Sequence, residues 1–230
     1  MAKLKQVTVA DHERLFFIRW VHLLIIANDA AGLPEATRQR LHALLFVSFA
    51  SSKFYEIKPL RMRARRTDHG PYYRMAHVAL GHLVMAGFVE VTEFRPYPAP
   101  RDLQFEGIFR PTLDGLRAGE KLRKTLTGEK IYRLLLDICL ASAEALDTEV
   151  RPDEAAVLDQ TLSEDLTYQR ALKKHGEMLE LEDPADLQTP TVRGLMAIDE
   201  RLQGRGFFNK RDTVAVYQTL MFKRAIGVMQ

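Results

Sequence analysis

Four closely spaced arginines are the side chains best suited to chemistry in this chain of 230 residues. Arg61, Arg63, Arg65 and Arg66 lie in the run Arg-Met-Arg-Ala-Arg-Arg, the densest basic stretch of the sequence. Guanidinium groups neutralise phosphates and release counterions, which gives affinity for nucleic acid without reading its sequence. The run therefore predicts a contact with a nucleic-acid backbone. Salt bridges to an acidic protein partner and a solvated loop are the alternative interpretations.

No catalytic or metal-binding motif accompanies the arginines. The sequence has neither a glycine-rich phosphate loop followed by Lys-Ser/Thr nor a Gly-x-Ser-x-Gly elbow. Cys139, the single cysteine, lies in an apolar run, where we expect a core residue rather than a nucleophile. His77 and His82 are five residues apart, which differs from the i, i+4 spacing of helical zinc ligands. We expect a protein that is not an enzyme and that holds no metal or cofactor.

A second cluster carries the opposite charge. Carboxylates crowd the stretch over residues 177–186, which we interpret as an exposed acidic connection or a docking site for a basic partner. Residues 1–130 contain 21 Lys and Arg against 13 Asp and Glu, whereas residues 131–230 contain 12 against 17. This asymmetry suggests two different partners, although chance variation of helix surfaces is the simpler alternative.

The most apolar segment, residues 21–27, is shorter than the roughly 20 residues that cross a bilayer. The first residues show no signal peptide. A single cysteine fits a reducing compartment. We therefore expect a cytoplasmic protein that does not contact membranes.

The elements that position the arginines follow a recognisable order. Gly70-Pro71 forms a turn before an amphipathic helix that runs to about residue 86. A strand over 88–94, a proline-rich loop over 95–101 and a return strand over 105–110 come next. This order predicts a mainly α protein with a small β-hairpin. We expect a winged-helix body over 1–126, with its wing at about 88–110, and a helical region over 127–230.

The body begins with a helix over about 11–30, which is apolar on nearly all sides and is therefore buried in a core or an interface. A second helix is expected from Pro34 to Ser51, with Pro34 in its first turn. The candidates for a partner interface are Leu15, Phe16, Trp20, Leu23 and Tyr72.

A winged helix would direct residues 71–77 toward a groove of DNA. We therefore expect Tyr73, Arg74 and His77 to be exposed and to join the arginine run as candidates for DNA contact. Arg95 and Arg101 flank the proline-rich loop, so the base of the wing is basic as well. Further helices are expected at about 113–126, 129–147, 152–167, 189–202 and 212–226, while residues 168–188 stay unassigned.

Two stretches resemble a known family. Gly70-Pro71-Tyr72-Tyr73 matches a Gly-Pro-(Tyr/Phe)-x element, and residues 80–89 match a Leu-x-x-Leu-x-x-x-Gly-(Leu/Phe)-(Val/Ile) element. With the two N-terminal apolar helices, residues 11–94 resemble the middle components of bacterial ABC three-component anti-phage systems of the Lamassu type. These are small helical proteins encoded between an SMC- or ABC-like ATPase and an effector. Residues 127–230 lie outside the resemblance.

The resemblance implies an adaptor subunit without catalytic residues. Such a subunit would bridge the ATPase and an effector nuclease, and it would help to hold the nuclease inactive until foreign DNA is sensed. Contact with double-stranded DNA is a further expectation. The alternatives are a stand-alone winged-helix regulator of transcription and an antitoxin, since both can share the fold.

Overall fold

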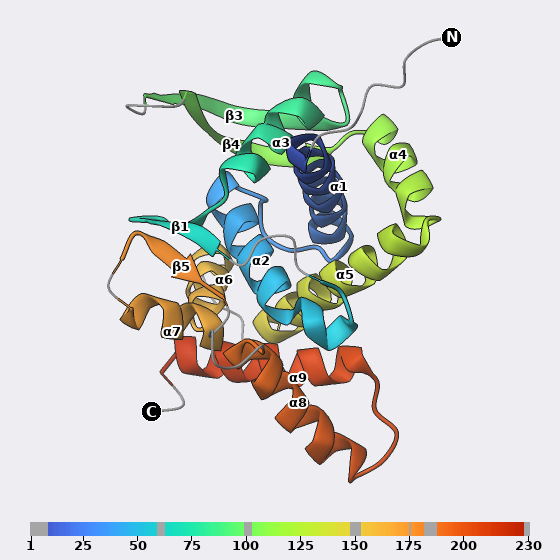
Figure 1. The fold of residues 1–230 in the computed structure, drawn as a ribbon, viewed down its shortest axis with the longest axis vertical. Helices are drawn as coiled ribbons and strands as arrows, with labels where there is room; N and C mark the ends of the chain where they lie inside the picture. The colour runs from blue at the N-terminus through green and yellow to red at the C-terminus, as the bar shows by residue number, and fades with distance from the viewer. Residues whose placement is uncertain are drawn as a thin grey trace.

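The computed structural model describes residues 9–58, 63–98, 103–147, 153–174, 176–181 and 188–227, and most of them are helical (Figure 1). This confirms the expectation of a mainly α protein with a small β-hairpin, to which the structure adds a second antiparallel sheet of three strands. The elements are, in chain order, α1 (Val9–Ala30), α2 (Arg38–Ser51), the 3-10 helix η1 (Ser52–Tyr55), β1 (Arg63–Thr67), β2 (Gly70–Tyr72), α3 (Arg74–Met85), β3 (Val89–Pro98), β4 (Leu103–Pro111), α4 (Leu113–Arg123), α5 (Leu126–Leu146), α6 (Glu154–Ser163), α7 (Leu166–Lys173), β5 (Met178–Glu180), α8 (Pro190–Gln203) and α9 (Lys210–Ala225).

The predicted hairpin is present and is longer than expected. Strands β3 and β4 pair from Val89 opposite Pro111 to Pro98 opposite Leu103. The prediction that the prolines would end the strand was wrong, because Pro96 and Pro98 both belong to β3. A proline lacks the N–H that a strand interior needs, and it is tolerated on the edge of a sheet, which suits β3 as a strand with one neighbour.

Helix α2 starts later than predicted. The side chain of Thr37 caps it by accepting a hydrogen bond from the amide of Arg40 at 3.3 Å. Pro34 lies in the connection before this cap rather than in the first turn. The same connection meets the hairpin, since Thr37 forms a β-bridge with Ile108 and the Phe109 amide donates to the Ala36 carbonyl at 3.1 Å.

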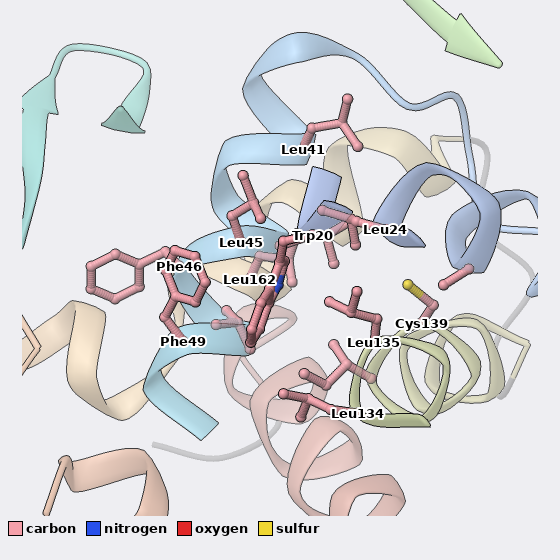
Figure 2. Packing of buried hydrophobic residues seen from close by; sticks show 14 of the residues in the cluster. Trp20, Leu24, Leu41, Leu45, Phe46, Phe49, Leu134, Leu135, Cys139 and Leu162 are labelled. Carbon is pink, nitrogen blue, oxygen red and sulfur yellow. The ribbon is translucent and has the colours of Figure 1, made fainter. Parts of the chain in front are cut away.

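The N-terminal and C-terminal regions share one hydrophobic core. Figure 2 shows side chains of α1, α2, α5 and α6 meeting around Trp20, which is fully buried and packs edge-on against Phe49 at 4.9 Å between ring centroids. Leu135 and Cys139 extend the cluster along α5. Cys139 is in the core as predicted, and burial raises the pKa of its thiol to about 12.

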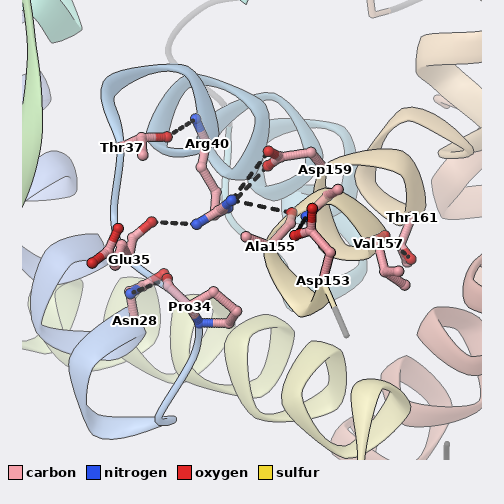
Figure 3. Close-up of polar contacts among 11 residues, drawn as sticks. Asn28, Pro34, Glu35, Thr37, Arg40, Asp153, Ala155, Val157, Asp159 and Thr161 are labelled. Carbon is pink, nitrogen blue, oxygen red and sulfur yellow. Dashed lines mark hydrogen bonds and ion pairs between the residues drawn. The ribbon is translucent and has the colours of Figure 1, made fainter. Parts of the chain in front are cut away.

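An ion pair between the buried Arg40 and the partly exposed Asp159 joins α2 to α6. The guanidinium of Arg40 donates from Nε to Asp159 Oδ1 at 2.9 Å and from Nη2 to Asp159 Oδ2 at 3.1 Å (Figure 3). Arg40 also donates to the backbone carbonyls of Ala155 and Glu35. Two parallel bonds to one carboxylate fix both distance and orientation, so this contact sets how α6 lies on α2.

The buried carboxylate of Asp165 organises the C-terminal helices. Asp165 Oδ2 accepts hydrogen bonds from Thr191 Oγ1 at 2.7 Å and from the Tyr217 hydroxyl at 2.9 Å. Asp165 Oδ1 accepts from the amides of Thr167 and Tyr168 at 2.9 and 3.0 Å and so caps α7. The cap divides the predicted helix over 152–167 into α6 and α7.

Helix α4 lies unusually close to the end of α3. A Cβ added to Gly115 would lie 1.9 Å from the Phe88 carbonyl oxygen, so only glycine fits there. Thr112 completes the contact by donating from Oγ1 to the Gly87 carbonyl at 2.7 Å.

Among the helices of the described residues, none is long and apolar enough to span a bilayer.

Candidate nucleic-acid interface

Three of the four arginines, Arg63, Arg65 and Arg66, belong to strand β1. Arg63 and Arg65 are exposed, whereas Ala64 between them is buried. Arg66 is exposed as well, and its guanidinium is 3.5 Å from the Leu172 carbonyl. The first member of the run, Arg61, lies outside the described residues.

The partner of β1 is the acidic segment itself. Strand β5 pairs antiparallel with β1, with Arg63 opposite Glu180 and Ala64 opposite Leu179, and β2 pairs with the other edge of β1. Arg63 forms an ion pair with Glu180 at 3.1 Å. The prediction of an exposed acidic connection was therefore wrong for residues 178–181, where Leu179 and Leu181 are fully buried. Glu177 is exposed as predicted, and the other acidic residues of the stretch, Glu182, Asp183 and Asp186, lie outside the described residues.

An open groove of about 420 Å³ lies beside this sheet. Arg63 and Arg65 of β1 and Arg74 at the first turn of α3 line it, together with Glu13 of α1 and Met178 of β5. Glu13 and Glu180 neutralise only part of the charge that these arginines bring. The groove therefore presents net positive charge in a concave setting, which is the arrangement that attracts a phosphate chain.

Buried His42 fixes the start of α3 beneath this groove. Its Nδ1 accepts a hydrogen bond from the backbone amide of Tyr73 at 3.1 Å, and its ring lies 5.0 Å from the ring of Tyr72. Burial, followed by the positive charge of Arg38 and the nearby His77, lowers the pKa of His42 to about 3. The imidazole is therefore neutral and serves as an acceptor at neutral pH.

Two of the predicted DNA contacts are buried. Tyr73 is 4 % exposed and packs against the rings of Phe17 and Phe49 at 6.0 and 5.3 Å. His77 is 7 % exposed and lies on the inner side of α3, near Tyr72. The expectation that both are exposed was wrong, because the face of α3 turned toward α1 and α2 includes positions 73 and 77. Tyr73 contributes only a small part of its surface to the wall of the groove, and His77 is not among the residues that line it.

Two of the predicted partner contacts also belong to the core. Trp20 and Leu23 are fully buried, and Trp20 donates from Nε1 to Ser48 Oγ at 3.1 Å within the chain. Their place in an interface was wrongly predicted, because α3, α4 and α5 cover α1 on several sides. Leu15 stays largely exposed, while Phe16, which stacks on Trp20 at 5.0 Å, and Tyr72 are half-buried.

The β3–β4 hairpin carries the last described candidate. Arg95 is exposed on β3, directly after a β-bulge between Thr92 and Arg95. Figure 1 shows the end of the β3–β4 hairpin that is far from α3 and strand β1 both on the left of the view. Arg101 lies outside the described residues.

The outer face of α3 is poor in groups that read bases. Arg74, His82 and Met85 are exposed along it, with half-buried Val78 and Gly81 between them. Direct readout relies on Arg, Lys, Asn or Gln side chains that bond to base edges. Arg74 alone on this face is of that kind.

Glu180, Met178 and His42 are site residues that the sequence analysis missed. The alternation Met178-Leu179-Glu180-Leu181 is a short strand signal that could have revealed β5. His42 offered no such signal, because its contacts arise from residues 31 positions away.

Within the described part of the chain, no three His, Cys, Asp or Glu side chains gather as a metal site would require. Comparison with protein-family models, curated proteins and solved structures returned no match to this chain.

Proposed function

We propose that this protein is a non-catalytic adaptor of winged-helix type that contacts the backbone of duplex DNA. The order of its first elements supports the winged-helix assignment: α1, a bridge at Thr37, α2, α3 and the hairpin β3–β4. A winged helix has the same order, with a short strand after the first helix that pairs with the wing. The hairpin β1–β2 is then an insertion between the second and third helices, and it brings the arginines to the start of α3.

The observation that carries the DNA contact is the groove shared by Arg63, Arg65 and Arg74. Three guanidinium groups on two rigid elements can follow consecutive phosphates. Arg66 beside the groove and Arg95 on the wing extend the positive surface. The composition of the outer face of α3 favours backbone contact over base reading, and this makes the stand-alone regulator the weaker alternative.

Exposed apolar side chains support the adaptor part of the proposal. Met85 at the end of α3 is 89 % exposed and Leu113 at the start of α4 is 65 % exposed. The two helix ends are tied together by the bonds of Thr112 to Gly87 and Phe88. Apolar side chains that share one surface region commonly mark a contact with another protein. The partners proposed from the family resemblance are an SMC- or ABC-type ATPase and an effector nuclease.

DNA binding is tested by fluorescence anisotropy with a random duplex of about 20 base pairs across a salt series. Replacement of Arg63, Arg65 and Arg74 by alanine should lower the slope of log K against log salt by about 3. The matched control replaces Arg201, Arg205 and Lys223, which are exposed on α8, the α8–α9 turn and α9, and removes the same charge. If both triple variants lose the same affinity for the duplex and the same salt dependence, the groove has no special role in DNA binding. A preference of more than about a thousandfold for one sequence would instead favour the regulator.

The adaptor role is tested by co-expression with the products of the neighbouring genes. We expect a stable complex with an ATPase and a nuclease, and we expect its loss when Met85 and Leu113 are both replaced by glutamate. The control replaces Met196, which is exposed on α8, by glutamate. If the protein purifies as a monomer and no ATPase is purified with it, the adaptor proposal is contradicted. The DNA-binding test does not depend on this outcome.

A further inference from the structure

A row of three side chains crosses the three-stranded sheet on the side of the arginine groove. Arg65 of β1 lies opposite Tyr72 of β2 on one edge and opposite Met178 of β5 on the other. Directly opposed residues of antiparallel strands place their side chains on the same face of a sheet. All three residues line the groove. The next opposed pair, Ala64 and Leu179, is buried, so the other face of the sheet belongs to the core.

Two members of this row give the groove an apolar surface. Met178 is 45 % exposed, and Tyr72 is half-buried with its ring 5.0 Å from the ring of the buried His42. Met75 of α3, also half-buried, extends the apolar lining. Thioether and aromatic side chains are favourable neighbours for a flat aromatic group. A phosphate chain by itself requires cations only, so contact with phosphates leaves this apolar surface unused.

The middle member of the row supplies a cation. Arg65 is exposed, and its guanidinium has no ion-pair or hydrogen-bond partner among the described residues, whereas Arg63 is paired with Glu180 at 3.1 Å. The row therefore fits a ligand that carries a flat ring and an anion close together. A nucleotide carries both, as its base and its phosphate. Only an unpaired nucleotide can present both, because the bases of a duplex are already stacked on one another.

We propose that the groove binds an unpaired nucleotide of DNA, with its base against Tyr72 and Met178 and its phosphate on Arg65. The groove volume of about 420 Å³ lies within the range of about 300 to 1,000 Å³ that is usual for pockets of small organic ligands. The inference rests on the proposed DNA contact and adds which form of DNA the groove prefers. Every base has a flat face, so the contact is independent of sequence.

Three fluorescent probes of about 12 nucleotides test the proposal on the wild-type chain by anisotropy. They are a thymidine strand, the same strand with its bases removed, and a duplex of the same length. The two strands carry the same phosphates, so the difference between their affinities measures the contribution of the bases. We expect the thymidine strand to bind at least about 5-fold more tightly than the abasic strand. Equal affinities of the two strands would overturn the inference.

Met178→Ala shows whether the base lies in the groove. The variant should bind the thymidine strand about 3-fold or more weakly than the wild type does, because apolar contact with the base is lost. Its binding of the abasic strand and of the duplex should be unchanged. Met196→Ala is the matched control, since Met196 is 48 % exposed on α8. If Met178→Ala keeps the full preference for the thymidine strand, the base lies elsewhere and the inference is refuted.

Arg65→Ala shows whether the phosphate lies beside the base. It should lower the slope of log K against log salt by about 0.7 for either strand, as expected for the loss of one phosphate contact on single-stranded DNA. Arg201→Ala, at an exposed position of α8, is the control. An unchanged slope for Arg65→Ala would contradict the proposed position of the phosphate.

The duplex separates this inference from the proposed function. If the two strands bind equally while the duplex binds with the expected salt dependence, only the inference about unpaired nucleotides fails. If no probe shows salt-dependent binding, the proposed DNA contact fails, and this inference fails with it.

Free nucleotides share the chemistry of an unpaired nucleotide, and competition with thymidine monophosphate distinguishes the two sources. The monophosphate should displace the thymidine strand only at a large molar excess, because a strand can also contact Arg66 and Arg95, which are exposed. Displacement by an equal concentration of the monophosphate would assign the groove to a free nucleotide and overturn the proposal.

Discussion

Histidine 42 should make the stability of this protein depend on pH in a way that one substitution removes. Its imidazole is buried, accepts the Tyr73 amide through Nδ1, and has no hydrogen-bond partner for Nε2 among the described residues. Protonation would break the bond to Tyr73 and place a buried charge near Arg38 and His77. The folded state therefore takes up this proton only at a pH far below that at which the unfolded chain does.

The magnitude follows from the two pKa values of His42. The pKa is about 3 in the folded chain, against 6.5 for an unperturbed histidine. Because the unfolded state binds the proton first, the free energy of unfolding falls as pH drops from 6.5 toward 3 and is constant above 6.5. With these two pKa values, the free energy of unfolding is lower than at neutral pH by about 2 kcal/mol at pH 5 and by about 4 kcal/mol at pH 3.5.

Urea unfolding of the wild type and of His42→Asn at several pH values between 7.5 and 4 measures this loss. The asparagine Oδ1 can still accept the Tyr73 amide, but it does not titrate. The variant should be less stable than the wild type at pH 7.5, because the smaller side chain leaves a cavity, and this deficit should shrink by about 2 kcal/mol at pH 5. His12→Asn, at an exposed position of α1, is the control and should follow the wild type. A deficit that is independent of pH would refute the reasoning.

Two further predictions concern stability and can be checked by thermal or urea unfolding. Asp165→Asn should cost about 2–4 kcal/mol, because the carboxylate accepts four hydrogen bonds and the amide would set its own donors against those of Thr191 and Tyr217. If the unfolding midpoint of Asp165→Asn equals that of the wild type, the hydrogen bonds around residue 165 rearrange without loss of stability. Gly115→Ala should destabilise by about 2 kcal/mol or more, because its Cβ meets the Phe88 carbonyl, whereas Gly81→Ala should stabilise by about 0.5–1 kcal/mol, since nothing lies within 4 Å of that Cβ. If Gly115→Ala is more stable to unfolding than Gly81→Ala, the close packing described for α4 is contradicted.

Local patterns in the sequence predicted most of the helices. The helix over 11–30 and the hairpin after residue 88 followed from apolar periodicity and from alternation flanked by turn residues. The cap at Thr37 was missed because Pro34 offered an equally plausible first turn. Asp165 was read as part of a helix because its hydrogen-bond partners Thr191 and Tyr217 are far along the chain.

The candidate site could be predicted only in part. The composition of the run identified the arginines as candidates, but their place on β1, with Arg63 and Arg65 exposed and Ala64 buried, comes from the structure. The burial of Tyr73 and His77 was not predictable from α3 alone, because it depends on which side of that helix meets α1 and α2. The pairing of β1 with β5 was missed because it joins Arg63 to Glu180, more than a hundred residues later.

That pairing has a consequence for the growing chain. Strand β1 and helix α3 are synthesised early, but β5 emerges from the ribosome only after residue 180 has been translated. Domains begin to fold from the N-terminus during synthesis, and contacts between distant segments form last. A nascent or prematurely terminated chain can therefore form the helices around Trp20 yet leaves one edge of β1 without its partner strand. The groove lined by Arg63, Arg65 and Met178 is then completed only on chains translated through β5, so truncated products lack one of its walls.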